Sequence, residues 1–304
     1  MVTFEKYLAA LAFAAVFLLL SPSNATAQDA QTGAPPAPQP AAQKTIDPKL
    51  PSLFVVGDST ANNNAKGQQG WADPFAAFFD TTKINVVNRA RAGRSSRTFL
   101  TEGLWDNALG LMKPGDTVLV QFGHNDGGPL DTGRARGSLP GTGEETREVA
   151  RADGRKEVVY TFGHYLRRFI ADAKAKGVTP ILLSLTVRNI WKDGKVERGS
   201  GKFGQWAAEV ARAEGVAFID VTSIIADRYE ALGQEQVQPL FGGDHTHTSP
   251  AGAEANAAAV VAGLKGLKDC GPCKYFSAKA EEVKAHKAAG AKRVGQRAGE
   301  SVNG

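Results

Sequence analysis

Short, nearly continuous apolar runs alternate with amphipathic segments from about residue 50 to residue 267. Runs rich in Val, Ile and Leu without polar alternation are typical of strands buried on both faces of a parallel sheet. The sequence predicts strands of this kind at residues 52–56, 84–88, 117–121, 180–184 and 217–220.

Helical spacing of apolar residues separates these strands. The predicted helices cover residues 71–79, 104–112, 162–176, 203–214 and 251–267. Gly177 and Gly215 follow two of them as C-terminal stops, and Ser249 and Pro250 provide a cap and a first-turn proline for the last one. Strands alternating with helices predict an α/β fold: a three-layer α/β/α sandwich around a five-stranded parallel sheet.

One segment interrupts this alternation. Residues 127–160 are rich in Gly, Arg and Glu, and they contain "EVARADGRKEVVY". The Asp153-Gly154 pair is typical of a tight turn, so this stretch predicts a β-hairpin that turns at those two residues.

The N-terminal segment differs in composition from this body. An apolar run at residues 8–20 precedes the small residues Ala25 and Ala27, which is typical of a secretory signal peptide cleaved before Gln28. An uncleaved anchor is the alternative. Residues 28–48, rich in Pro, Ala and Gln, predict a disordered linker. We therefore expect a secreted or periplasmic protein with a signal peptide (1–27), a linker (28–48), a folded domain (49–268) and a basic tail (269–304).

Charge and cysteine content narrow the possible partners. The net charge is +5, of which residues 274–304 carry +4, so we expect a solvated tail and no nucleic-acid partner. Cys270 and Cys273 lie in "CGPC". In a cytosolic βαβ unit this spacing would indicate redox chemistry, but in an exported chain it favours a small local disulfide.

Polar segments follow the ends of the predicted strands, where a parallel sheet binds its ligands. "GDST" with Ser59, "NRARAGRSSRTF" with Gly93 and "QFGHNDGG" with Asn125 follow the first three strands. "FGGDHTHTSP", with Asp244 and His247, precedes the last helix. We expect these segments to converge on one edge of the sheet.

The residues in these segments match the needs of acyl transfer. Ser59 is the candidate nucleophile, although Asp-Ser-Thr taken alone would favour a helix cap. His247 is the candidate base, and Asp244, three residues earlier, is the candidate carboxylate that orients it. The backbone N–H groups of Ser59 and Gly93 and the side-chain amide of Asn125 are candidate oxyanion donors.

Together, "GDST", "ARAGRSSRTF", "GHND" and the D-x-x-H of "DHTH" resemble the blocks of the SGNH (GDSL-like) hydrolases, specifically the rhamnogalacturonan acetylesterase group. Ala61 replaces the second glycine of a G-x-S-x-G elbow, which argues against an α/β-hydrolase. The resemblance implies a flavodoxin-like sheet, a catalytic domain over 49–268, and no metal or cofactor. It implies the catalytic residues Ser59, Asp244 and His247 and an oxyanion hole of Ser59, Gly93 and Asn125.

The implied activity is that of a secreted serine esterase that removes O-acetyl groups from pectic polysaccharide through an acetyl-enzyme. The expected partner is an acetylated polysaccharide, and we expect a monomer without stable membrane association. Two alternatives remain open: a related esterase acting on another acetylated carbohydrate such as xylan or on small esters, and a non-catalytic carbohydrate-binding protein.

Several neighbouring residues have more than one interpretation. Asp58 is predicted to support the turn. His245 competes with His247 as the base, and the D-x-x-H spacing favours His247. His124 is predicted either to line the site or to pack, and His164, within a helix, to be non-catalytic.

Arginine and tryptophan residues also gather near these segments. The arginines are Arg89, Arg91, Arg94, Arg97, Arg134, Arg136 and Arg188. Because guanidinium groups bind carboxylates well, we expect one to three of them to contact an anionic substrate and the others to be solvated or paired. Trp71, Trp191 and Trp206 are expected either to stack on sugars or to pack.

Overall fold

The computed structural model describes residues 45–151, 153–199 and 201–286. The predicted signal peptide, residues 28–44 of the predicted linker, and residues 287–304 of the predicted tail lie outside these ranges. Within them, no helix combines the length and the apolar character that crossing a membrane requires.

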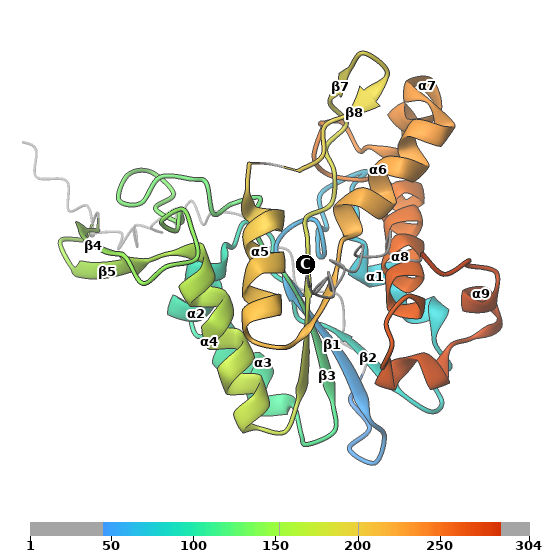
Figure 1. The fold of residues 1–304 in the computed structure, drawn as a ribbon, viewed down its shortest axis with the longest axis horizontal. Helices are drawn as coiled ribbons and strands as arrows, with labels where there is room; N and C mark the ends of the chain where they lie inside the picture. Colours follow the sequence, from blue (N-terminus) through green and yellow to red (C-terminus); the bar gives the residue numbers. More distant parts are fainter. Residues whose placement is uncertain (1–44, 152, 200, 287–304) are drawn as a thin grey trace, which may run out of the picture. The chain divides into compact units, whose positions relative to one another are not determined.

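A five-stranded parallel sheet forms the centre of the fold, with strand order β2-β1-β3-β6-β9 (Figure 1). The strands are β1 (Ser52–Gly57), β2 (Asn85–Asn88), β3 (Thr117–Gln121), β6 (Thr179–Leu183) and β9 (Ala217–Ile219). The predicted α/β fold and its flavodoxin-like sheet are confirmed. Every predicted strand ends within one residue of its observed bounds.

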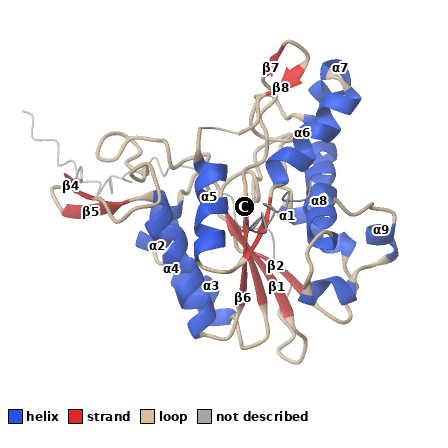
Figure 2. Cartoon of the chain, viewed as in Figure 1, coloured by secondary structure: helices blue, strands red, loops and turns tan. Residues whose placement is uncertain are grey.

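Both faces of the sheet are covered by helices, which explains the continuous apolar strands. In β1, Leu53 and Val55 point into one core cluster and Phe54 and Val56 into the other, as the two-residue period of a strand requires. One face carries α1 (Ala72–Phe75), α6 (Val221–Leu232) and α8 (Pro250–Lys265). The other carries α2 (Ser96–Thr101), α3 (Leu104–Leu111), α4 (Phe162–Ala175) and α5 (Phe203–Ala213), as Figure 2 shows.

Local capping begins several of these helices. The Ser95 side chain accepts a hydrogen bond from the Thr98 N–H at the start of α2, and Asp220 accepts one from the Ser223 N–H at the start of α6. Ser249 caps α8, with Pro250 at its first turn, as predicted. Neither α2 nor α6 was predicted, because at least half of the residues of each helix are buried and polar residues are among them, which blurs the amphipathic pattern.

Short elements extend this framework. The predicted hairpin is confirmed as β4 (Thr146–Ala150) and β5 (Lys156–Tyr160), which pair antiparallel and project away from the sheet (Figure 1). A second hairpin, of β7 (Trp191–Lys192) and β8 (Lys195–Val196), was not predicted. The other short helices are η1 (Ala76–Phe78), α7 (Gln234–Val237) and η2 (Gln238–Leu240).

The segment predicted to be a solvated tail begins inside the folded unit, which corrects that prediction. It contains η3 (Gly271–Tyr275) and α9 (Ala278–Glu281). Phe276 packs on Phe79 with ring centroids 5.1 Å apart, and Ala280 is fully buried. Cys270 and Cys273 form the predicted disulfide. The prediction followed charge alone, whereas the apolar residues hold this segment to the core.

Candidate active site

The candidate residues lie at the carboxyl edge of the sheet, beside its topological switch point. The chain leaves β1 for β2 on one side and later returns to β3 on the other. Ligands of such sheets bind where this reversal opens a crevice. Ser59 follows β1, Gly93 follows β2 and Asn125 follows β3, so the topology itself gathers these three residues.

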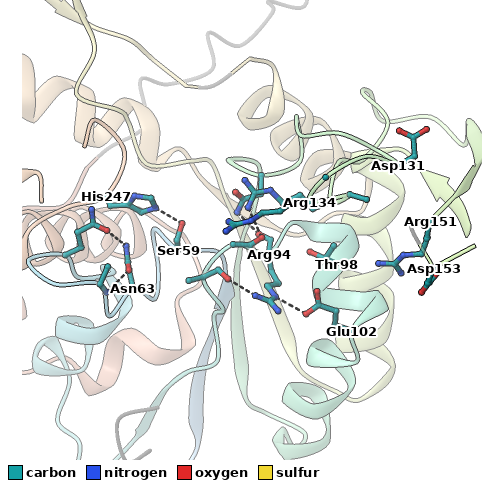
Figure 3. A pocket seen from close by; sticks show the side chains of 18 residues that line it. Ser59, Asn63, Arg94, Thr98, Glu102, Asp131, Arg134, Arg151, Asp153 and His247 are labelled. Atoms are coloured by element: carbon teal, nitrogen blue, oxygen red, sulfur yellow. Dashed lines mark hydrogen bonds and ion pairs between the residues drawn. The ribbon is translucent and has the colours of Figure 1, made fainter. Parts of the chain in front are cut away.

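Ser59, His247 and Asp244 form a continuous hydrogen-bonded chain. The Ser59 Oγ lies 2.9 Å from His247 Nε2 (Figure 3). On the other side of the ring, His247 Nδ1 lies 2.8 Å from Asp244 Oδ2. When Nδ1 carries the proton and donates a hydrogen bond to the carboxylate, Nε2 is left to accept the hydroxyl proton. This is the geometry of a serine nucleophile and its base.

Hydrogen bonds between two distant loops hold this chain together. Ser59 and His247 are 188 positions apart in the sequence. The Gln69 N–H donates to the Thr248 carbonyl (2.8 Å), and the Thr248 hydroxyl donates back to the Gln69 carbonyl (2.9 Å). The loop after β1 and the loop before α8 are therefore joined next to Ser59 and His247.

Asp244 is held as an ionised, fixed acceptor. Its Oδ1 accepts hydrogen bonds from the N–H groups of Thr246 (2.7 Å) and His247 (2.8 Å). Partial burial would raise the pKa of Asp244, but hydrogen bonds from the His247 ring and these N–H groups outweigh it and hold that pKa well below its usual range. The carboxylate therefore remains available to orient and stabilise the imidazole.

Two amide side chains that the sequence analysis missed extend this network. Gln68 Nε2 donates to Asp244 Oδ2 and to the Gly242 carbonyl, both at 2.9 Å. Asn63 Nδ2 in turn donates to Gln68 Oε1 at 2.8 Å. Both residues lie in "ANNNAKGQQGW", directly after the "GDST" segment. Their closeness to Ser59 in the sequence was the available signal. Amide residues are common in turns, however, and these two follow no helix or strand periodicity that would mark them as part of a site.

The turn around Ser59 depends on Asp58, as predicted. Asp58 Oδ1 accepts hydrogen bonds from the Thr60 N–H (2.9 Å) and the Thr60 hydroxyl (2.8 Å). Asp58 and Thr60 are buried, whereas Ser59 between them is partly exposed. The "GDST" segment thus buries its two outer polar residues and presents the middle hydroxyl to the cleft.

Three donors are arranged as a candidate oxyanion hole. Among the described residues, the N–H groups of Ser59 and Gly93 have no hydrogen-bond acceptor. Gly93 has φ +78°, a left-handed conformation that favours glycine, and its carbonyl accepts a hydrogen bond from Arg136 Nη1 (3.0 Å). Asn125 Nδ2 donates one N–H to the Arg94 carbonyl (2.8 Å), which leaves its second N–H free for a ligand.

The other histidines occupy different positions. His247, rather than the exposed His245, bonds to Ser59. His124 Nε2 lies 3.2 Å from the Thr186 hydroxyl, and burial lowers the pKa of this imidazole, which favours the packing interpretation. His164 bonds to Glu144 and stacks on a tyrosine of β5, consistent with a non-catalytic role.

A polar cleft of about 980 Å³ opens in front of Ser59 and His247 (Figure 3). Its charged lining residues are Arg94, Glu102, Asp131, Arg134, Arg136, Arg151 and Asp153. Arg97 and Trp71 are fully buried, and Trp206 packs edge-on against Phe203. These aromatic rings therefore belong to the core and not to the cleft wall.

Comparison with known proteins places this site in a family. Residues 55–255 match the GDSL-like Lipase/Acylhydrolase family. The chain is 33% identical over 222 residues to the rhamnogalacturonan acetylesterase of Emericella nidulans, covering 72% of this chain and 88% of that protein. It is 28% identical over 233 residues to the rhamnogalacturonan acetylesterase RhgT of Bacillus subtilis, covering 71% and 90%.

A solved structure supports the fold. The YxiM protein of Bacillus subtilis superposes with a TM-score of 0.56 at 24% identity, covering 71% of this chain and 56% of that chain. The family match spans well over half of the sequence and contains all the predicted blocks. The chain therefore belongs to the GDSL-like lipase/acylhydrolase family of carboxylic ester hydrolases, as those blocks predicted.

Proposed function

We propose that the protein is a secreted serine esterase that removes O-acetyl groups from pectic polysaccharide. The observation that carries this proposal is the Ser59–His247–Asp244 chain, with contacts of 2.9 and 2.8 Å at the edge of a polar cleft. The two relatives named rhamnogalacturonan acetylesterase support the substrate class.

Acylation begins when the Ser59 oxygen attacks the acetyl carbonyl and its proton passes to His247 Nε2. Asp244 stabilises the imidazolium that results. The carbonyl oxygen becomes an oxyanion and accepts hydrogen bonds from the N–H groups of Ser59 and Gly93 and from the Asn125 amide. His247 then protonates the departing sugar hydroxyl as the ester bond breaks, which leaves an acetyl group on Ser59.

Deacylation repeats these steps with water as the nucleophile. His247 removes a proton from the water, which attacks the acetyl-enzyme and forms a second oxyanion at the same donors. The Ser59 oxygen leaves and recovers the proton from His247, and acetate departs. The only groups exchanged are a proton and an acetyl group, so these side chains are sufficient for the reaction.

The cleft favours a sugar polymer over a lipid. Its wall is open and lined largely by charged and amide side chains, and no long apolar channel leads away from Ser59 among its lining residues. Sugar hydroxyls and carboxylates match such a wall, whereas an acyl chain would need apolar cover. Acetylated xylan and small esters remain the competing substrates.

The proposal is tested by measuring acetate release by wild type and by Ser59→Ala. The substrates are acetylated rhamnogalacturonan and acetylated xylan. We expect faster release from the rhamnogalacturonan and a loss of at least roughly 10⁴-fold in the variant. Unchanged polysaccharide binding by Ser59→Ala would show that the variant is folded. Unchanged turnover would refute the mechanism, and polysaccharide binding without release by wild type would favour the non-catalytic alternative.

Export is proposed from the N-terminal pattern alone. N-terminal sequencing of protein recovered from the periplasm or the medium should begin at Gln28 if residues 1–27 are removed. A mature protein that retains residue 1 would instead support the uncleaved anchor.

A further inference from the structure

The arginines that line the cleft fall into two groups. Arg94 Nε lies 2.8 Å from Glu102 Oε2, and Arg151 Nη1 lies 3.2 Å from Glu157 Oε2, so both of these guanidinium groups have an acidic partner. Figure 3 shows Arg94 directed at Glu102. Arg94 thus has a carboxylate of its own before any ligand binds, whereas Arg151 shares the Glu157 carboxylate with Arg97.

Arg134 and Arg136 form the second group. Neither has an acidic partner within 4.0 Å in the part of the chain that the structure describes. The Arg136 guanidinium donates to the Gly93 carbonyl (3.0 Å). Burial and the nearby Arg134 and Arg94 charges lower the pKa of Arg136, against the raising effect of the more distant Asp58 and Asp126. Two neighbouring cations without a carboxylate in direct contact repel each other, and a bound anion would reduce that cost.

The loop that carries these two arginines is fixed by a third arginine. Arg97, which is fully buried, donates from Nη1 to the carbonyls of Leu130 and Gly137, both at 2.9 Å. Its Nε and Nη2 bind the Glu157 carboxylate in a bidentate pair at 2.8 and 2.7 Å. Arg97 therefore clamps both ends of residues 130–137 and anchors them to β5.

Close backbone contact reinforces this clamp. The Gly137 N–H donates to the Pro129 carbonyl at 2.8 Å, which closes the neck of the loop. A Cβ atom on residue 137 would lie 2.0 Å from the Gly128 carbonyl oxygen, so the two segments approach more closely than a side chain permits. A loop held this tightly presents Arg134 and Arg136 without a large ordering cost on binding.

We propose that Arg134 and Arg136 form a subsite for the carboxylate of a uronate residue in the polysaccharide, adjacent to the acetyl ester. This inference rests on the proposed esterase function and specifies its substrate. Guanidinium groups bind carboxylates with two parallel hydrogen bonds. Arg136 contacts the Gly93 carbonyl, and Gly93 supplies a candidate oxyanion donor. The carboxylate therefore belongs to the acetylated sugar or to its immediate neighbour.

Paired substrates test the subsite. One is an acetylated rhamnogalacturonan oligosaccharide with free carboxylates, and the other is the same oligosaccharide with its carboxylates converted to neutral amides. Wild type should prefer the anionic substrate in kcat/KM, mainly through KM, and this preference should decrease with added salt. Arg134→Gln should lower the anionic-to-neutral ratio roughly tenfold, because it removes a charge-assisted hydrogen bond. Arg134→Lys should retain part of it.

Arg212→Gln is the matched control. Arg212 lies in the last turn of α5, which leads into β9 at the opposite, amino edge of the sheet. Its loss removes the same charge, and both substrates should react as with wild type. Calorimetry of the deacetylated anionic oligosaccharide with Ser59→Ala, with and without Arg134→Gln, measures the same contact without turnover and should show a roughly tenfold weaker Kd.

The outcomes separate this inference from the proposed function. The subsite is overturned, and the esterase left intact, if wild type releases acetate from both substrates at equal rates. In that case the anionic-to-neutral ratio of kcat/KM would also be unchanged in Arg134→Gln and in the Arg134→Gln/Arg136→Gln double variant. Absence of acetate release by wild type from either substrate overturns the esterase function and the subsite with it. Equal losses in Arg134→Gln and Arg212→Gln would show a general charge effect and also overturn the subsite.

Discussion

The carboxyl edge of the sheet and the insertion over residues 127–160 are held by different kinds of contact. At the edge, several separate hydrogen bonds join the loops that carry Ser59 and His247, including those between Gln69 and Thr248 and the one from Gln68 to Asp244. In the insertion, one buried side chain, Arg97, makes four of the holding contacts. Loss of one residue at the edge removes only part of its contacts, whereas loss of the Arg97 side chain removes all four of these contacts together.

This difference predicts that chemistry and substrate preference are separable. The Ser59–His247–Asp244 chain makes no hydrogen bond to residues 127–160 among the described residues. The insertion meets the edge where Arg136 bonds to the Gly93 carbonyl and where the Gly128 and Ser138 N–H groups bond to the carbonyls of Asn125 and Asp126. Damage to the edge should therefore abolish turnover on every substrate, and damage to the insertion should act first on selectivity and stability.

The largest effect is expected at the edge, in a pair of neighbouring histidines. His247→Ala should lower kcat by at least roughly 10⁴-fold on all acetyl esters, because the Ser59 hydroxyl loses its base. His245→Ala is the matched control, since His245 is exposed and does not bond to Ser59. Initial rates of acetate release measure both. Comparable losses in the two variants would contradict the assignment of His247 as the base.

The next effect is expected in the insertion. Arg97→Met leaves the Leu130 and Gly137 carbonyls without their donor and Glu157 without its bidentate partner. Breaking a buried pair of this kind costs about 3–5 kcal/mol of unfolding free energy. Denaturant unfolding measures this loss. The variant should keep most of its turnover on a small acetate ester while losing preference for an anionic substrate.

An exposed ion pair provides the control for Arg97→Met. Arg168 pairs with Asp172 at 2.7 Å on the surface of α4, and Arg168→Ala should cost only about 0–1 kcal/mol. A double-mutant cycle of Arg97→Met with Glu157→Leu should show a coupling of the two losses. Additive losses, or a loss in Arg97→Met no larger than in Arg168→Ala, would mean that the clamp does not hold the insertion.

The same comparison explains what could be predicted from the sequence. The strands and the Ser59, Gly93 and Asn125 segments follow from local patterns, because a parallel sheet places every strand's carboxyl end at one edge. The D-x-x-H spacing is also local, and its bonds within residues 244–247 are contacts between near neighbours. The sequence pattern was therefore sufficient to predict residues that lie close together in the chain or that follow strands of the regular parallel sheet.

Long-range side-chain contacts could not be predicted in this way. Gln68 meets Asp244 across 176 positions, and Arg97 meets Glu157 across 60. Seven arginines near the site have the same chemistry in the sequence, and only burial and pairing separate Arg97 from Arg134. The tail prediction failed similarly, because counting charge overlooked the packing of Phe276 on the core.

Asp126 lies where the two regions meet. Its carbonyl accepts the Ser138 N–H of the insertion at 2.9 Å, and its carboxylate accepts bonds from the Ser96 N–H and hydroxyl at the start of α2. It directly follows Asn125, the candidate oxyanion residue. Burial raises the pKa of Asp126 from 3.8 to about 7, against the lowering effect of the Ser96 hydrogen bonds. Ionisation of Asp126 would therefore affect the contact between the carboxyl edge of the sheet and the insertion.

The raised pKa predicts a pH-dependent stability. The folded state binds this proton more tightly than the unfolded state, so the stabilisation is complete below about pH 4 and is lost as the pH rises through 7. Asp126→Asn keeps an acceptor for Ser96 but cannot ionise. The unfolding free energy of wild type relative to this variant should fall by roughly 2–4 kcal/mol between pH 4 and pH 7.5.

Asp106→Asn, on the exposed face of α3, removes a surface carboxylate and controls for net charge. A wild-type curve that runs parallel to the Asp126→Asn curve would mean that Asp126 does not titrate in this range. It would also mean that the edge and the insertion meet without a buried ionisable group between them.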